Sequence, residues 1–218
     1  MQQTFSKSPH SSLLSPLLVS SLLLALVIMV AVGIGSEYIS PPRVLGALFH
    51  GFTGVSLSSD DTIIWQMRLP RVLLSALVGA ALAVSGLAFQ GLFRNPLADP
   101  YLLGVASGAG LGATVVMVFA ASVPLLIVIG VPLAAFVAGL LSVLCVLALA
   151  RQGNTVPLVT LILAGVVVGS VLTAATSFVM LYSKTQGLSI LSWLLGSFTF
   201  ASWQKVFIML PTCVVVFL

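Results

Sequence analysis

Charged residues are scarce in this sequence, and their scarcity indicates the class of protein. Only 6% of the 218 residues are Asp, Glu, Lys or Arg, whereas 60% are hydrophobic and the mean hydropathy is +1.25. A soluble domain carries roughly 25% charged residues, because its surface must meet water. Most of the surface of this chain must therefore meet lipid. The same composition excludes a disordered chain and a disulfide scaffold.

Residues and motifs for catalysis or nucleotide binding are also missing. Cys145 and Cys213 each lie in an apolar stretch without a partner at metal-ligand spacing, which is typical of a small apolar residue. His10 and His50 have no evident partners, and no catalytic Ser/His/Asp, Cys/His or paired-carboxylate set is present. No G-x-x-x-x-G-K-[ST] motif occurs. The sequence therefore predicts no enzyme, no metal site and no directly bound cofactor. Because Lys and Arg are not clustered, it predicts no nucleic-acid partner either.

Long apolar runs predict an all-α protein, a polytopic bundle of about six membrane-spanning helices. A helix needs about 20 apolar residues to cross the hydrocarbon core. The runs lie at residues 17–35, 72–93, 101–119, 126–149, 155–182 and 203–218. We expect residues 1–16 to form a tail and residues 17–218 to form one transmembrane domain. A signal peptide is the alternative for the first run, whose length favours an uncleaved span.

Two segments depart from the simple pattern of spans. Residues 39–52 place Val44, Leu45, Leu48, Phe49 and Phe52 at helical spacing, which predicts a short amphipathic helix on the membrane surface. The last run has about 16 residues and reaches only about 24 Å at 1.5 Å per residue. It ends without a polar flank, so we expect a truncated C-terminus, in either a fragment or a naturally shortened product.

Small residues recur at three- or four-residue spacing inside the predicted spans and indicate helix–helix contacts. Lipid offers no hydrophobic drive for helix association, so close backbone approach through small residues replaces it. The predicted packing positions are Gly79, Ala83 and Gly86 in the second span and Gly104, Gly108 and Gly112 in the third.

The few charges near the spans are the candidates for function. Arg68 and Arg71 flank Pro70 at the head of the second span. They either anchor the helix at the interface by snorkelling or form a docking pair for acidic residues of a partner, since guanidinium groups bind carboxylates bidentately. At the other end of this span, Asn95, Pro96, Asp99 and Pro100 predict a turn, with Asp99 as the cap of the next helix and Pro100 at its first position.

The distribution of Lys and Arg leaves the orientation ambiguous. If the N-terminus is inside and six spans alternate, most of the Lys and Arg residues fall outside. The positive-inside rule alone therefore favours the opposite orientation.

Several motifs resemble one family of membrane proteins. They are Trp65-Gln-Met-Arg-Leu-Pro-Arg71, Gly79-Ala-Ala-Leu-Ala83 with Ser85-Gly86, Gln90, Phe93, Asn95-Pro-Leu-Ala-Asp-Pro100, Leu103-Gly104, Ser107-Gly-Ala109, Leu163-Ala-Gly165 and Trp193-Leu-Leu-Gly196. This series is similar to the FecCD-type permeases, the membrane subunits of type II ATP-binding-cassette importers for iron-siderophores, heme and vitamin B12. The similarity is collinear from about residue 37 to residue 205.

The resemblance implies a permease of about ten helices in the inner membrane of a prokaryote, with a cytoplasmic N-terminus. Its partners would be a second permease copy, cytoplasmic ATPase subunits that bind the ATP, and an extracytoplasmic substrate-binding protein. Arg68 and Arg71 match the outward-facing arginines that receive glutamates of the binding protein. The fifth span resembles the helix beside the translocation path, and its candidate path residues are Thr160, Gly165, Gly169 and Thr173, whose small and hydroxyl side chains suit helix packing equally well.

Three functions are therefore weighed. The first is import of a metal chelate, with iron-siderophore or heme as the first expected substrate and cobalamin as the second. The second is a truncated permease remnant with a structural or interaction role only, because the family continues for more helices than this chain contains. A secondary transporter is the third, and the lack of ionisable residues at the span centres disfavours it.

Overall fold

The computed structural model describes residues 9–53, 58–96, 99–120, 122–123, 126–183 and 186–217, which are mostly helical. In chain order the elements are α1 (Pro9–Gly33), α2 (Pro41–Thr53), α3 (Ser59–Thr62), the π-helix η1 (Ile63–Arg68), α4 (Leu69–Phe93), the 3-10 helix η2 (Pro100–Leu103), α5 (Val105–Phe119), the π-helix η3 (Leu126–Gly130), α6 (Val131–Ala150), α7 (Leu158–Leu181), α8 (Gly187–Leu194) and α9 (Trp203–Phe217). Within these ranges no β-strand occurs, and an isolated bridge joins Gln152 and Thr155.

The lengths of the helices confirm the all-α polytopic architecture. Among the described residues, four helices are long and apolar enough to cross a bilayer: Ser15–Gly33, Ser59–Phe93, Leu126–Ala150 and Leu158–Leu181. The spans expected at 101–119 and 203–218 are shorter apolar helices, α5 and α9, of 15 residues each. At 1.5 Å per residue such a helix reaches roughly 22 Å. Residues 1–8 of the expected tail lie outside the described residues, and α1 begins before the predicted start at residue 17.

The chain divides into two compact units. Residues 1–79 and 198–218 form the N-terminal unit, and residues 80–197 form the central unit. In the N-terminal unit, the end of α1, the helix α2 and η1 enclose a core whose fully buried side chains include Val32, Val44 and Ile64. The helix expected at 39–52 is present as α2, but only part of its apolar stripe faces this core. Val44 is buried and Leu48 packs against the core, whereas Leu45 and Phe49 are exposed.

The long helix Ser59–Phe93 starts with a well-defined cap. Ser58 Oγ accepts a hydrogen bond from Asp61 N at 3.3 Å, and Ser58 N donates to Asp61 Oδ2 at 3.0 Å. This reciprocal pair satisfies two of the N–H groups that a helix start leaves free. Asp60 and Asp61 in the first turn also carry the negative charge that the N-terminal end of the helix dipole favours.

The π-helix η1 follows from the proline in the motif Arg68-Leu-Pro-Arg71. Pro70 has no N–H and its ring crowds the carbonyl four residues earlier, so the α hydrogen-bond pattern is interrupted there. The ladder widens instead, and Leu69 N donates to Ile64 O, five residues back. In this wider register the carbonyl of Trp65 would pair with the missing N–H of Pro70. The indole of Trp203 donates to that carbonyl, with Nε1 at 2.7 Å from Trp65 O.

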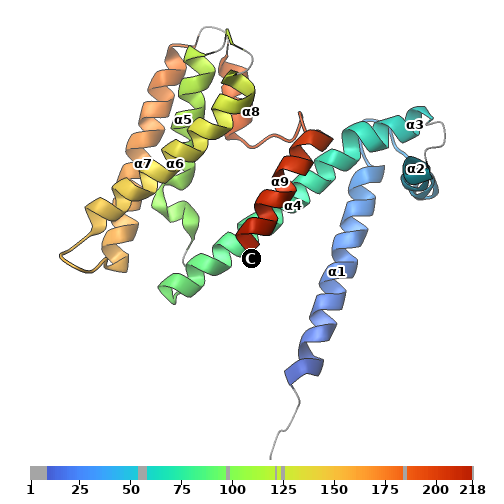
Figure 1. Ribbon diagram of the computed structural model, residues 1–218, viewed down its shortest axis with the longest axis horizontal. Helices are drawn as coiled ribbons and strands as arrows, with labels where there is room; N and C mark the ends of the chain where they lie inside the picture. Colours follow the sequence, from blue (N-terminus) through green and yellow to red (C-terminus); the bar gives the residue numbers. More distant parts are fainter. Residues whose placement is uncertain are drawn as a thin grey trace, which may run out of the picture. The chain divides into compact units, whose positions relative to one another are not determined.

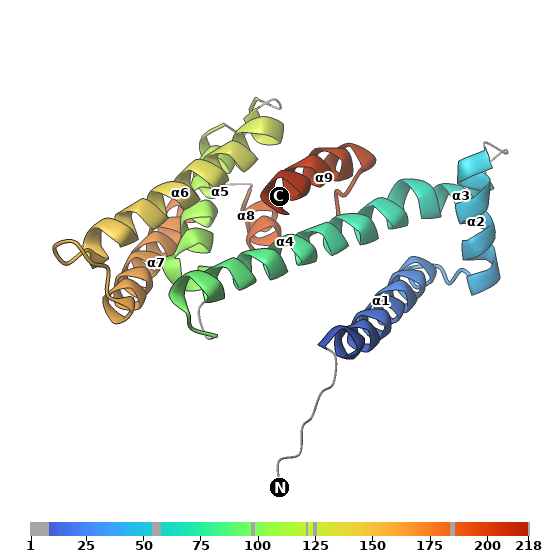
Figure 2. The same cartoon turned by 60° about the horizontal axis from the view of Figure 1, so that its bottom comes forward.

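In the central unit, α5, α6 and α7 lie side by side (Figures 1 and 2). Two apolar clusters hold this unit together, one around Leu103, Val146 and Leu161 and another around Ala113 and Val131. Helix α8 was not predicted from the sequence. It contacts α5, where Leu194 lies beside Gly110.

Glycines bring α5 and α6 into close contact. A Cβ added to Gly108 would lie 2.6 Å from Ala138 O and 2.7 Å from Ser142 Cβ, and one added to Gly112 would collide with the carbonyl of Ala134. Gly104 has φ 70° and begins α5, and its carbonyl accepts a hydrogen bond from Ser142 Oγ at 2.9 Å. For Gly79 and Gly86 the described residues offer no atom within 4 Å of an added Cβ, and Ala83 is likewise only a predicted packing position.

The predicted turn after α4 begins with an arginine in a left-handed conformation. Arg94 has φ 48°, its N–H donates to Gly91 O at 3.3 Å, and Asn95 N donates to Gln90 O at 3.2 Å. This is the Schellman arrangement that closes many helices, in which glycine normally occupies the left-handed position.

The same turn ends in the expected helix cap. Asp99 Oδ1 accepts a hydrogen bond from Tyr101 N at 2.8 Å, and Pro100 occupies the first turn. The capped element is the short 3-10 helix η2, after which α5 begins at Val105 rather than at residue 101. Pro96 is described and exposed, whereas Leu97 and Ala98 of the motif lie outside the described residues.

Candidate functional sites

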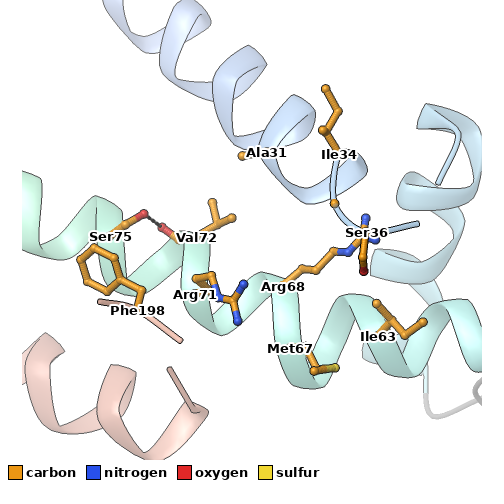
Figure 3. Close-up of a pocket in the computed structure, with 11 residues that line it drawn as sticks. Ala31, Ile34, Ser36, Ile63, Met67, Arg68, Arg71, Val72, Ser75 and Phe198 are labelled. Atoms are coloured by element: carbon orange, nitrogen blue, oxygen red, sulfur yellow. Dashed lines mark hydrogen bonds between the residues drawn. The ribbon is translucent and has the colours of Figure 1, made fainter. Parts of the chain in front are cut away.

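The first candidate site lies in the N-terminal unit and contains both predicted arginines. We call it the arginine pocket (Figure 3). It has a volume of about 410 Å³ and is lined by Ala31, Ile34, Gly35, Ser36, Ile63, Met67, Arg68, Arg71, Val72, Ser75 and Phe198. Its walls therefore come from the end of α1 with the following loop, from the η1–α4 helix and from the segment before α9. Apart from the two arginines, Ser36 and Ser75, the lining is apolar.

Arg68 is buried, and its guanidinium is engaged with backbone carbonyls. Only 8% of the residue is exposed. Nη1 donates to Val32 O and to Gly33 O at 2.9 Å each, and Nη2 donates to Glu37 O. Figure 3 shows the side chain reaching the loop that carries Ser36. Three of its N–H donors are therefore engaged inside the protein.

Arg71 has the opposite environment. It is exposed, and Nη2 donates to Thr199 O over a long distance of 3.4 Å. In an α-helix, residues three apart lie on one face. Arg68 is the last residue of the π-helix η1, and Arg71 lies in the first turn of α4. The structure places them in one pocket but gives them different contacts.

An aromatic cluster supports the helix that carries the arginines. The rings of Trp65 and Trp203 stack with centroids 5.7 Å apart, and Phe207 stacks on Trp203 at 5.9 Å. The Trp65 indole donates from Nε1 to Ala47 O at 2.8 Å. Gly51 makes this contact possible, because an added Cβ there would collide with the Trp65 ring.

Two pairs of polar side chains connect α2 with α3 in the same unit. Arg43 Nη1 lies 3.2 Å from Asp60 Oδ2, and His50 Nδ1 lies 3.3 Å from Asp61 Oδ2. The sequence offered no partner for His50, and that interpretation is corrected here. The acidic residue is eleven positions along the chain, and the packing of α2 on α3 brings the two together.

The second candidate site lies in the central unit, beside α7. We call it the hydroxyl groove. It has a volume of about 610 Å³ and is lined by Tyr101, Leu102, Gly104, Ser107, Gly165, Val166, Gly169, Ser170, Thr173, Ala174 and Ser177. Three of the four predicted path residues, Gly165, Gly169 and Thr173, line it. Thr160 is not in the lining, and its Oγ1 lies 3.3 Å from Gln152 Nε2.

The hydroxyl groups that α7 contributes to this groove lie within hydrogen-bonding distance of carbonyls of the same helix. Ser170 Oγ donates to Val166 O at 2.8 Å, and Ser177 Oγ donates to Thr173 O at 3.1 Å. Thr173 Oγ1 lies 2.8 Å from Gly169 O and 3.3 Å from Ser107 Oγ. A hydroxyl that donates to the carbonyl four residues back still has lone pairs to offer as an acceptor. The groove therefore presents uncharged oxygen atoms.

Gly165 has a structural task beside this groove. A Cβ at this position would collide with the carbonyl of Leu102, so Gly165 lets α7 approach η2 closely. Ser170 and Ser177 escaped the sequence analysis, although they recur at helical spacing with Thr173 and could have been found by that pattern. Sequence spacing offered no comparable signal for Trp203, which is 138 positions from its partner Trp65.

Comparison with known proteins gives one family. The profile of the FecCD transport family matches residues 23–218. The chain is 40% identical over 193 residues to the uncharacterized ABC transporter permease protein YvrB of Bacillus subtilis, covering 86% of this chain and 55% of that protein. It is 44% identical over 191 residues to the achromobactin transport system permease protein CbrC of Dickeya dadantii, covering 85% and 52%.

A third relative and a solved structure agree with these matches. The hemin transport system permease protein HmuU of Yersinia pestis is 38% identical over 210 residues, covering 91% of this chain and 60% of that protein. A solved structure described as an inward-facing conformation of a metal-chelate type ABC transporter matches with a TM-score of 0.71 and 29% identity, covering 92% of this chain and 59% of that one. The chain thus spans about half the length of the curated relatives it matches.

Proposed function

Because this chain belongs to the FecCD transport family, we propose that it acts in the permease subunit of an ABC importer that carries a metal chelate across the cytoplasmic membrane. The family consists of transporter permease subunits, which are not themselves enzymes. Iron-siderophore or heme is the proposed substrate class, and cobalamin is the second candidate. Relatives named for achromobactin and hemin transport support the first substrate class, and a relative named for cobalamin import supports the second.

The proposed assembly contains a second permease copy, ATPase subunits and an external binding protein. The N-terminus is proposed to be cytoplasmic, so that the end of α1 and the start of α4 lie at the outer surface. The arginine pocket then opens to the side from which the binding protein arrives. ATP hydrolysis belongs to the ATPase subunits in this proposal, and the permease supplies the docking surface and the path.

The hydroxyl groove is the observation that carries the transport proposal. A bulky chelate needs a path that is wide, polar enough to be wetted and not so charged that the substrate is held. Gly165 and Gly169 leave space beside α7, while Ser170, Thr173 and Ser177 offer oxygen acceptors without charge. We assign this groove to the translocation path.

Substitutions of Thr173 and Val171 test this assignment. Thr173→Trp would fill the groove and should lower the uptake rate at least about tenfold without lowering the amount of permease in the membrane. Val171→Trp adds the same bulk to the same helix at an exposed apolar residue that does not line the groove. Uptake of labelled ferric siderophore, heme and cobalamin is measured for both. Equal uptake by the two variants would remove the groove from the proposed path.

Docking is proposed to depend on Arg71. Its exposed guanidinium has one long hydrogen bond to Thr199 O, so it can meet an acidic side chain of the binding protein. Arg71→Glu should weaken binding-protein affinity at least about tenfold, since like charges then face each other. Replacing the matching acidic residue of the binding protein by Arg should restore it. Arg151→Glu, which alters an exposed arginine in the α6–α7 loop, is the matched control.

The docking role of Arg68 stays a prediction of the sequence. Its three hydrogen bonds to backbone carbonyls occupy the guanidinium inside the protein. Three of its five N–H donors are held in this way, and each hydrogen bond to a charged group contributes roughly 1.5–3 kcal/mol. The geometry therefore favours Arg71 as the residue that meets the partner.

A further inference from the structure

The carbonyls that Arg68 binds belong to the end of a helix. The last carbonyls of an α-helix have no partner within the helix, and they carry the negative end of its dipole. Val32 and Gly33 are the final residues of α1. The guanidinium of Arg68 donates to both carbonyls and supplies a positive charge where the dipole favours one. Arg68 is therefore a cap for α1 contributed from another helix.

The same guanidinium also holds the loop that follows α1. Nη2 donates to Glu37 O, four residues beyond the end of the helix. Gly35 lies against it, because a Cβ there would be 2.8 Å from Nη2 of Arg68. Ile39 N donates to Gly33 O at 3.1 Å and closes the loop on itself. The loop thus bends around the arginine, and glycine is the residue that lets it do so.

This loop is one wall of the arginine pocket. Ile34, Gly35 and Ser36 line the pocket together with Arg71. If the loop were released, the pocket would lose that wall while Arg71 kept its place on α4. The orientation of Arg68 toward α1 therefore determines the shape of the surface on which Arg71 stands.

We propose that Arg68 is a positioning residue that fixes the loop of residues 34–37 by capping α1, so that the arginine pocket keeps its shape around Arg71. This inference rests on the proposed docking function of Arg71. It assigns to Arg68 a role different from direct contact with the binding protein. An arginine suits this task because its planar fork donates in several directions at once, which a lysine ammonium on a flexible stem does less well.

Amide hydrogen exchange of the permease in its membrane, without any binding protein, tests the holding role. The amides of Ile34 and Ile39 are hydrogen-bonded and report on the end of α1 and on the loop. Arg68→Gln should speed their exchange at least about tenfold, because local opening no longer breaks the cap. Arg68→Lys should give an intermediate rate. Arg71→Gln should leave the exchange rates of Ile34 and Ile39 unchanged. In Arg68→Gln, the exchange rates of peptides from α5, α6 and α7 should also stay unchanged. Unchanged exchange in Arg68→Gln would overturn the proposal.

Gly35→Ala supplies a second test that keeps both arginine charges. The added methyl group would collide with the guanidinium, so it should speed loop exchange as Arg68→Gln does. It should also weaken the affinity of the binding protein, in this case without a charge change. If Gly35→Ala loosens the loop and affinity stays normal, positioning is not needed for docking and the proposal fails.

Two further outcomes separate this inference from the docking proposal. If Arg68→Gln weakens affinity with normal loop exchange, and an acidic-to-arginine change in the binding protein rescues Arg68→Glu, then Arg68 contacts the partner directly and the inference is wrong. If Arg71→Glu has no effect on affinity, the docking proposal is wrong. In that case the exchange data still decide whether Arg68 holds the loop.

Discussion

In the N-terminal unit, three side chains donate to backbone carbonyls of other segments, whereas in the central unit α5 and α6 touch mainly through glycine and alanine, with the bond from Ser142 Oγ to Gly104 O as an exception. Arg68, Trp65 and Trp203 each bind a carbonyl of a different segment. Gly108 and Gly112 instead let α5 approach α6 until their backbones are nearly in contact. Both units expose large apolar side chains, so hydrophobic burial does not explain why their helix contacts differ.

The location of free backbone groups explains the contrast. The carbonyls that Arg68 and Trp203 bind in the N-terminal unit lie at a helix end and at a π turn, where carbonyls lack a partner within the helix. Contacts in the central unit lie in the middle of α5 and α6, where the carbonyls are already paired. At such positions close packing remains as the means of association, and small residues provide it.

The largest expected effect comes from removing the cap of α1. Arg68→Leu would leave the buried carbonyl of Val32 without its donor and would remove one donor from the carbonyls of Gly33 and Glu37, which we expect to cost about 3 kcal/mol in free energy of unfolding. Reversible unfolding of the purified permease in mixed micelles measures it. Arg71→Leu is the matched control and should cost less than about 1 kcal/mol. Equal losses for the two variants would show that the buried hydrogen bonds of Arg68 contribute no more to stability than the exposed side chain of Arg71.

The next effect tests close packing in the central unit. Gly108→Ala places a methyl group against Ala138 O and Ser142 Cβ, and overpacking of this kind costs about 2 kcal/mol. Gly110→Ala is the control on the same helix, since its methyl group would meet the flexible end of Leu194 at 3.1 Å and should cost less than about 1 kcal/mol. The same unfolding measurement compares them. A loss in Gly110→Ala as large as in Gly108→Ala would contradict the α5–α6 contact.

The sequence predicted the helices better than it predicted the contacts. The long apolar runs correctly placed α1, α4, α6 and α7, because a membrane span must be about 20 apolar residues long. The spacing of Gly108 and Gly112 also indicated one contact face. The boundaries were less accurate, since the short η2 and α8 carry no long-range hydrophobic period that would reveal them.

The candidate sites show a different limit of sequence reasoning. The sequence predicts Arg68 and Arg71 as a docking pair, and the structure gives them separate partners within one pocket. Which carbonyl Arg68 reaches depends on the packing of α1, 31–36 residues earlier in the chain. Such contacts depend on tertiary structure, so motif spacing cannot supply them.

A smaller effect is expected from the hydrogen bond between Trp203 and the π turn. Trp203→Phe keeps an aromatic ring beside Trp65 but removes the N–H that donates to Trp65 O. The loss of that donor should cost about 1 kcal/mol. Trp193→Phe in the central unit, where the side chain packs against the Ala113 cluster, is the control and should cost less. If Trp193→Phe is the more harmful change, side-chain donors do not distinguish the N-terminal unit.

The smallest effect should come from the exposed ion pair between Arg43 and Asp60, and it separates charge from burial within one unit. The two side chains are 73% and 27% exposed, so water and salt screen their attraction. Arg43→Ala should therefore lower the free energy of unfolding by only about 0.5 kcal/mol, and that difference should vanish at high salt. The effect of Arg68→Leu should persist at high salt, because buried hydrogen bonds to carbonyls are screened far less. Unfolding titrations of both variants at low and high salt decide the matter. A salt-resistant loss of more than about 1 kcal/mol in Arg43→Ala would mean that charge stabilises this unit even at its surface, and the contrast between exposed charges and buried donors would then fail.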